Sequence, residues 1–135
     1  MIVLNPIGRV ISPLTDRSAA PKQGNEGAPE AWLELAPEFI DAATDLAVGH
    51  EILILTWLDR AERSVLRVRP RDNPNARLRG VFSTRSPDRP NPIGLHRATI
   101  VAVEGATRFQ VNELEAIDGT PVLDIKPVLK PDRER

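Results

Sequence analysis

The side chains best suited to chemistry lie in one proline-rich segment, Gly80–Leu95. Its prolines at 87, 90 and 92 fix their own φ angles and restrict the residues before them, which predicts a stiff loop. Such a loop can hold Arg85, Arg89 and Asn91 in one geometry at a small entropic cost. A guanidinium group binds carboxylates and phosphates bidentately, so the expected ligand is an anion. For Arg89 the alternative is that it braces its own loop.

A second candidate segment is Asp118–Pro127, in which a turn leads into a strand. Asp-Gly is typical of a tight turn, and the residues after it favour a strand. Side chains two positions apart on a strand share a face, so we expect Asp124 and Lys126 to lie side by side. The ammonium group would hold the carboxylate ionised or anchor an anionic group of a substrate. The alternative is a simple ion pair at the surface.

The charge of the chain is concentrated around the first segment. The 135 residues carry a net charge of −1, with 15 Arg against 3 Lys. Residues 60–97 hold ten arginines and three acids, a net charge of +7, whereas residues 1–59 carry −6 and residues 98–135 carry −2. An arginine-rich middle segment again indicates recognition of phosphate or carboxylate. The alternative is that these arginines pair with acids of the N-terminal third.

Composition excludes several classes of function. The chain has no Cys, which rules out disulfides, thiolate nucleophiles and Cys-type zinc sites, and two histidines are too few for a His-rich metal centre. No Gly-x-Gly occurs, so neither a Rossmann loop nor a P-loop is present. No Ser–His–Asp set is recognisable by spacing. We therefore expect one cytoplasmic domain over residues 1–135, with no metal, signal peptide or membrane span.

The elements that must position these residues are short strands. The expected strands cover residues 2–11, 31–35, 51–58, 64–69, 81–84, 98–103, 108–114 and 121–127. Pro6 would make the first of these an edge strand, because proline cannot donate to a ladder. Pro37–Leu46 predicts one short helix, and residues 14–30 predict a long loop. Short strands without βαβ order predict an all-β fold, a small barrel or sandwich.

The two candidate segments resemble the YaeB/TsaA-like (TrmO) family of S-adenosylmethionine-dependent tRNA methyltransferases. The resemblance rests on Arg85-Ser86-Pro87 with Arg89–Leu95, on Asp118–Pro127, and on supporting matches at Ile7–Pro13, Pro21–Gln23 and the strand after His50. It implies a small β-barrel of about six to seven strands with one short helix, not a Rossmann methyltransferase. It also implies a homodimer, with S-adenosyl-L-methionine as the cofactor near the subunit interface. The implied reaction methylates N6 of threonylcarbamoyladenosine beside the anticodon of tRNA.

The resemblance further implies which residues bind the cofactor. They are Pro21, Lys22 and Gln23 in the long loop, Arg85 and Leu95 in and after the stiff loop, and Asp118, Gly119, Thr120 and Pro121 at the turn. Leu58 and Asp59 stand at the end of the central strand, where the family often has His and a polar partner. Val128 replaces a usual Tyr, and the C-terminal extension of longer members is missing.

A methyl transfer of this kind is an in-line displacement, so the main task of the enzyme is to position donor and acceptor. The acceptor N6 is a poor nucleophile, and a base that takes its proton would help. Asp124, with Lys126 beside it, and Asp118 are the candidate catalytic residues. His50 is a third candidate base, and its alternative is a hydrogen-bonded core or interface histidine.

Substrate binding is expected at Arg85, Arg89 and Asn91, which can take the threonyl carboxylate or an RNA phosphate. Trp57 or Phe82 can stack on adenine. We expect His96 at the surface. Two other functions stay open: a barrel that binds S-adenosylmethionine or RNA without turnover, and a methyltransferase that acts on another small acceptor.

Overall fold

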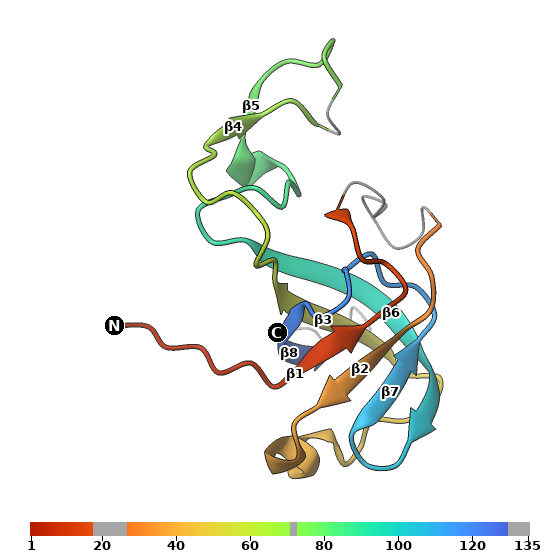
Figure 1. The fold of residues 1–135 in the computed structure, drawn as a ribbon. Helices are drawn as coiled ribbons and strands as arrows, with labels where there is room; N and C mark the ends of the chain where they lie inside the picture. The colour runs from red at the N-terminus through yellow and green to blue at the C-terminus, as the bar shows by residue number, and fades with distance from the viewer. Residues whose placement is uncertain (18–26, 71–72, 130–135) are drawn as a thin grey trace.

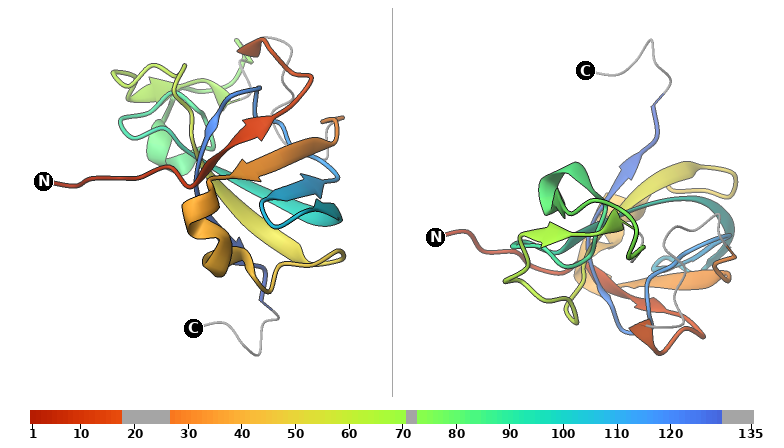
Figure 2. Two further views of the ribbon diagram at one scale, coloured as in Figure 1. Left: turned by 60° about the horizontal axis from the view of Figure 1, so that its bottom comes forward. Right: turned by 90° about the horizontal axis from the view of Figure 1, so that it is seen from above.

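Six antiparallel strands form a closed barrel in the computed structural model, which describes residues 1–17, 27–70 and 73–129 (Figures 1 and 2). The order around the barrel is β1-β2-β7-β6-β3-β8. The strands are β1 (Gly8–Ile11), β2 (Ala31–Leu35), β3 (Glu51–Trp57), β6 (Ile93–Glu104), β7 (Arg108–Val111) and β8 (Pro121–Pro127). Each strand pairs on both sides, so the barrel has no open edge. The predicted all-β fold, a small barrel without Rossmann topology, is confirmed.

The core fills the barrel interior, because every strand turns alternate side chains inward. Along β3 the buried residues alternate with half-buried ones, and the same period continues on β2 and β7. The largest fully buried apolar side chains come from all six strands and from the segment before β8: Val10, Leu33, Ile52, Ile54, Ile100, Phe109, Val111, Leu114 and Val122. These side chains form one cluster that holds the strands at fixed positions.

A lobe leaves the barrel between the end of β3 and the start of β6 (Figure 1). We call residues 58–92 the arginine lobe. It contains a two-stranded ribbon, β4 (Arg67–Val68) paired with β5 (Arg79–Gly80), followed by the 3-10 turn η5 (Val81–Ser83). The lobe includes the stiff loop of the sequence, and residues 84–92 form no helix or strand, as the three prolines predict.

The first strand is shorter than predicted and is not an edge strand. β1 begins at Gly8 and pairs with both β2 and β8. Pro6 precedes the strand, so its missing N–H does not interrupt a ladder. Residues 1–6 are exposed and run away from the barrel (Figure 1).

Other predicted elements also differ from the structure. Of the strand expected over 64–69 only β4 (Arg67–Val68) forms, and the strand expected over 108–114 ends at Val111. The strand expected over 81–84 is wrong, because Thr84 N–H donates to the Val81 carbonyl at 3.0 Å and closes the 3-10 turn. The expected helix is a 3-10 helix, η3 (Pro37–Ala43), and ends before Leu46. β6 begins at Ile93, five residues earlier than expected, directly after the last proline of the loop. Among the described residues no helix is long and apolar enough to cross a membrane.

Candidate functional site

Several segments that the sequence singled out meet at one end of the barrel. At this end β3 stops, β6 and β8 begin, and the chain leaves β1. Leu58 N–H donates to the Pro92 carbonyl at 2.8 Å, which joins the end of β3 to the stiff loop. Ser12 N–H donates to Asp118 Oδ1 at 3.0 Å, which joins the segment after β1 to the turn before β8. We call this the site end of the barrel.

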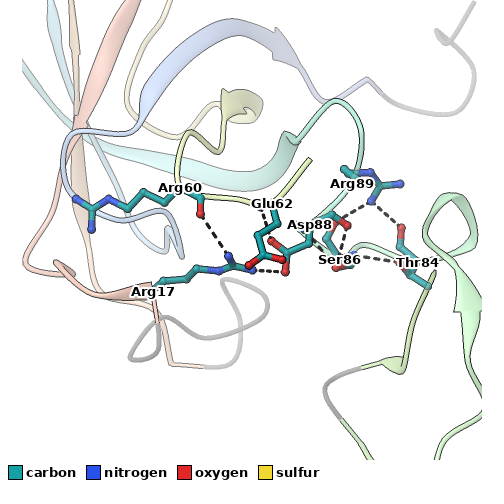
Figure 3. A network of polar contacts seen from close by, with 7 residues as sticks. All are labelled: Arg17, Arg60, Glu62, Thr84, Ser86, Asp88 and Arg89. Atoms are coloured by element: carbon teal, nitrogen blue, oxygen red, sulfur yellow. Dashed lines mark hydrogen bonds and ion pairs between the residues drawn. The ribbon is translucent and has the colours of Figure 1, made fainter. Parts of the chain in front are cut away.

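The stiff loop is fastened to the barrel through Asp88 (Figure 3). Arg17 Nη2 donates to Asp88 Oδ2 at 2.6 Å, and Glu62 N–H donates to Oδ1 at 2.9 Å. Arg60 Nη1 donates to the Thr15 carbonyl at 3.1 Å, a second link to the segment after β1. The charges of Arg17 and Asp88 therefore stabilise the position of the loop rather than stay available for a ligand.

Arg89 braces its own loop, which was the alternative to a role in substrate binding. Its Nη1 donates to the carbonyls of Thr84 and Ser86 at 3.0 and 2.9 Å (Figure 3). Its Nη2 donates to the Val81 carbonyl at 2.9 Å. Arg85, four residues earlier, is exposed and has no hydrogen bond or ion pair to any described residue. Of these two arginines, Arg85 has its whole guanidinium group available.

Asn91 is also held from within the lobe. Arg63 Nη2 donates to Asn91 Oδ1 at 3.0 Å, and Arg63 Nε donates to the Pro90 carbonyl at 2.7 Å. The same guanidinium lies 5.1 Å from the ring centroid of Trp57, so it covers one face of that ring. Phe82, in contrast, is 81% exposed on the lobe. A role for Arg89 and Asn91 in substrate binding stays a prediction, and Phe82 is the more accessible ring for stacking.

The Asp118–Pro121 turn is built mainly from backbone hydrogen bonds. Asp118 N–H donates to the Leu14 carbonyl, and Gly119 takes a φ of 83°, a conformation that favours glycine. Thr120 is buried, and its hydroxyl donates to the Ile117 carbonyl at 2.6 Å. Asp118 is exposed. This turn therefore presents a fixed carboxylate at the site end.

Asp124 and Lys126 lie side by side, as the strand period predicts, with Lys126 Nζ 3.2 Å from Asp124 Oδ2. Both point outward from β8, and Asp124 pairs with Leu55, which pairs in turn with Leu95. At the usual strand spacing Asp124 and Leu95 are about 10 Å apart on the outer face of the barrel. The pair is half-exposed, so as an ion pair it adds little stability.

Some of the remaining predicted cofactor residues lie at the site end, and the others lie outside the described residues. Leu58 is half-buried and Asp59 is exposed at the end of β3, while Leu95 is 44% exposed on β6. Pro21, Lys22 and Gln23 lie outside the described residues. None of these cofactor roles is tested by the structure.

The expectations for the two histidines need correction in part. His50, directly before β3, is exposed and is not a core histidine, but its Nδ1 accepts a hydrogen bond from Ala47 N–H at 3.3 Å. A place for His50 at an interface stays a prediction. His50 stands at the other end of β3 from Leu58, about 26 Å away at ~3.3 Å per residue, so it lies far from the site end. His96 is only 5% exposed inside the barrel rather than at the surface. Its imidazole joins Thr56 and Glu115, a set that sequence spacing did not reveal.

Among the described residues, no arginine of the lobe forms an ion pair with a described acid of the N-terminal third. Of the arginines between residues 60 and 97, Arg97 on β6 forms such a pair, with Glu51. Five arginines of the lobe are exposed and have no ion pair or hydrogen bond to a described residue: Arg67, Arg69, Arg77, Arg79 and Arg85. Within the described ranges no group of three His, Asp or Glu side chains is arranged to hold a metal ion. The lobe is therefore a positive surface beside the site end.

The fold and the site define a class of protein: a small closed antiparallel barrel whose loops, rather than a glycine-rich βα turn, form the site end. Residues 9–131 match the profile of the tRNA-methyltransferase O N-terminal domain, and the chain belongs to that family. The resemblance seen in the sequence is thereby confirmed.

Similar proteins include a probable S-adenosyl-L-methionine-binding protein of Methanothermobacter thermautotrophicus, 45% identical over 126 residues that cover 93% of this chain and 89% of the relative. An S-adenosyl-L-methionine-binding protein of Archaeoglobus fulgidus is 42% identical over 125 residues, with coverages of 93% and 88%. A crystal structure of TrmO from P. aeruginosa superposes with a TM-score of 0.75 and 32% identity. That match covers 100% of this chain and 57% of the TrmO chain, so this chain spans little more than half of that length.

Proposed function

We propose that this chain is an S-adenosyl-L-methionine-dependent methyltransferase that acts on N6 of threonylcarbamoyladenosine in tRNA. Family membership and the names of the archaeal relatives support the methyl donor. The observation that carries the proposal is that the stiff loop, the Asp118 turn and the end of β3 meet at one end of the barrel. Sequence resemblance alone assigned a cofactor role to residues in each of these segments.

The described residues at the site end fit the chemistry of this donor. S-adenosyl-L-methionine supplies an electrophilic methyl group and carries a sulfonium, an ammonium, a carboxylate and an adenine. Asp118 and Asp59 offer exposed carboxylates for the positive groups, and Arg85 offers a guanidinium for the carboxylate. Leu58 and Leu95 offer apolar surface for the adenine. The mixture of charge and apolar surface fits a zwitterion with a flat ring.

For the transfer itself the chain must orient the acceptor and take a proton from its N6. Asp124 is our choice of base, because its carboxylate lies on the outer face of the barrel that it shares with Leu95. Asp118 ranks second as the base, because its Oδ1 is already occupied by a hydrogen bond from Ser12 N–H. His50 is not retained, because it stands at the far end of β3.

The arginine lobe is the proposed contact with tRNA. Its unpaired arginines on and around the β4–β5 ribbon can each bind a phosphate, and the exposed ring of Phe82 can stack on an unpaired base. Binding through phosphates makes affinity depend steeply on salt. The overall charge of −1 hides this surface, because most of the acids lie elsewhere in the chain.

A homodimer is part of the proposal, and the outer face of β3 and β6 is the proposed contact. The outward residues Leu53, Leu55, Trp57, Ile93 and Leu95 form an apolar centre on these two strands. Charged pairs flank this centre, Arg97 with Glu51 on one side and Lys126 with Asp124 on the other. An apolar centre with a polar rim is typical of protein interfaces. Leu95, a predicted cofactor residue, lies within this face.

The direct test of activity uses labelled S-adenosyl-L-methionine with tRNA that carries threonylcarbamoyladenosine and with the same tRNA without it. Label in the modified tRNA alone is the expected result. Label in neither RNA, with donor binding intact, would contradict the proposed reaction.

A second candidate function is a barrel that binds the donor without turnover. It is favoured by the relatives that are named only as binding proteins and by the 57% coverage of the TrmO structure. The same assay separates the two, because a binding module would retain donor affinity and leave every acceptor unlabelled. A methyltransferase for another small acceptor would consume donor once that acceptor is supplied.

A further inference from the structure

The barrel interior contains a polar cluster that none of the roles above uses. It joins Thr56 on β3, His96 on β6 and Glu115 in the connection between β7 and β8. Thr56 Oγ1 lies 2.7 Å from His96 Nε2, and His96 Nδ1 lies 2.6 Å from Glu115 Oε1. Thr56 is fully buried and His96 is 5% exposed. Buried polar groups are costly unless they are hydrogen-bonded, so these contacts hold the cluster together.

The imidazole of His96 bridges the other two side chains. A carboxylate accepts but does not donate, so Nδ1 donates to Glu115 Oε1. Nε2 forms the other hydrogen bond, with the hydroxyl of Thr56. Hydroxyl, imidazole and carboxylate follow each other as in nucleophilic triads, but Thr56 has no exposed surface with which to meet a substrate. The cluster is therefore suited to holding structure rather than to attacking a bond.

A glycine next to the cluster leaves room for its side chains. Gly94 pairs with Thr56 across β3 and β6. A Cβ atom at position 94 would lie against Thr56 Oγ1 and 2.7 Å from His96 Nε2, closer than real contacts allow. The glycine thus makes the contact between threonine and histidine possible.

Each member of the cluster lies next to one segment of the site end. Thr56 is two residues before Leu58, His96 directly follows Leu95, and Glu115 is three residues before Asp118. The three segments come from distant parts of the chain, and the cluster links them through two short hydrogen bonds from inside the barrel.

We propose that Thr56, His96 and Glu115 form a positioning network for the methyl-donor site. The inference rests on the proposed function, since it assigns the network to the donor that the site end would bind. Its residues act through their neighbours and do not touch the donor. Rigid support of this kind is what a preformed binding site requires.

The test compares two replacements of one side chain. Thr56→Val keeps the shape and removes the hydroxyl, so the dissociation constant for S-adenosyl-L-methionine should rise about 10-fold. Thr56→Ser restores the hydroxyl and should return the constant to within about twofold of the unsubstituted chain. Glu115→Gln, at the half-buried end of the network, should raise the constant about fivefold, because a neutral acceptor makes a weaker hydrogen bond.

The matched control is Ile100→Val, a buried residue of β6 outside the network. It should lower Tm and leave the dissociation constant unchanged, because it only removes a methylene from the core. In the donor-free chain, Thr56→Val should shift the backbone amide resonances of Leu95 and Asp118, whereas the control should leave them in place.

The outcomes of this test separate the positioning network from the proposed function. A raised constant in Thr56→Val that Thr56→Ser reverses supports the positioning network. A lowered Tm in Thr56→Val with an unchanged constant overturns the network and leaves the proposed function standing. If the unsubstituted chain binds no donor, both proposals are overturned.

Discussion

Arg85 and Arg89 stand four residues apart in one loop and have opposite surroundings. Three backbone carbonyls occupy the guanidinium of Arg89, whereas that of Arg85 is exposed and meets no described residue. Residue type and spacing could not separate the two, because both arginines stand within two residues of a proline in the same motif. The structure divides them into a brace and an available anion-binding group.

This division predicts opposite effects on stability. Arg89→Ala removes three charge-assisted hydrogen bonds, including those to the carbonyls of Thr84 and Ser86, so Tm should fall by about 5–10 °C. Arg85→Ala removes an exposed side chain and should leave Tm within about 1 °C, as most surface substitutions do. Differential scanning calorimetry of the two variants checks both values. Equal changes in Tm would contradict the assignment.

The base is a second prediction at the scale of a residue. Asp124→Asn keeps the shape and removes the proton acceptor, so turnover should fall by about 100-fold or more while donor affinity stays the same. Single-turnover methylation and calorimetry on the same preparation give the two values. Lys126→Met is the companion variant, and it should slow turnover less. Unchanged turnover in Asp124→Asn would remove this carboxylate from the mechanism.

The bounds of the strands determine which of these side chains come together. The strands over 31–35 and 121–127 have the bounds that their sequence predicts, because alternating residues and nearby turn residues mark both ends. The strand predicted over 98–103 begins five residues too late, and that error hid His96. Ala98 and Ile100 are buried on one face, and the same period carried backward places His96 and Gly94 on that face. A correct strand start would therefore have predicted a buried histidine.

The rest of the site depended on distant parts of the chain. The sequence predicted that Asp124 and Lys126 share a face, since that follows from the strand period alone. The contact of Ser12 with Asp118, and that of Arg17 with Asp88, join residues 106 and 71 positions apart. No local pattern encodes such contacts, because they follow from closure of the barrel.

The ribbon of β4 and β5 carries the prediction at the scale of an element. Arg67→Gln combined with Arg79→Gln should weaken binding to a modified anticodon stem–loop RNA. The slope of log K against log salt concentration should fall in magnitude by about 1.4 to 1.8, the value expected for the loss of two phosphate contacts. Arg9→Gln, on the barrel and paired with Glu34, is the control and should leave the slope unchanged. Fluorescence anisotropy at several salt concentrations measures the slope. A slope equal to that of the unsubstituted chain would exclude the ribbon from RNA binding.

At the scale of the whole molecule, two surfaces indicate two different partners. The charge distribution indicates RNA, whereas the apolar outer face indicates a second copy of the chain. The arginine lobe is a positive surface beside the site end, and the outer face of β3 and β6 is apolar at its centre. The overall composition and net charge of the chain show neither feature. A dimer through the outer face would cover the apolar residues and leave the lobe exposed to RNA.

The dimer predicts the effect of one charge at that face. Leu53→Glu should convert the dimer to a monomer and keep the fold, since Arg97 and Lys126 flank this position and can pair with the new carboxylate. Val48→Glu, at an exposed apolar residue outside the face, should remain a dimer. Sedimentation velocity distinguishes the two states. A monomeric unsubstituted chain at micromolar concentration would contradict the proposed interface.

The central claim is that the site end of the barrel binds S-adenosyl-L-methionine through the stiff loop. Isothermal titration calorimetry with this donor, on the unsubstituted chain and on Arg85→Ala, tests it most directly. We expect saturable binding to the unsubstituted chain and an affinity at least about 10-fold weaker for Arg85→Ala, the usual loss for one charge-assisted contact. Absence of binding to the unsubstituted chain, or equal affinity in the two, would contradict the account.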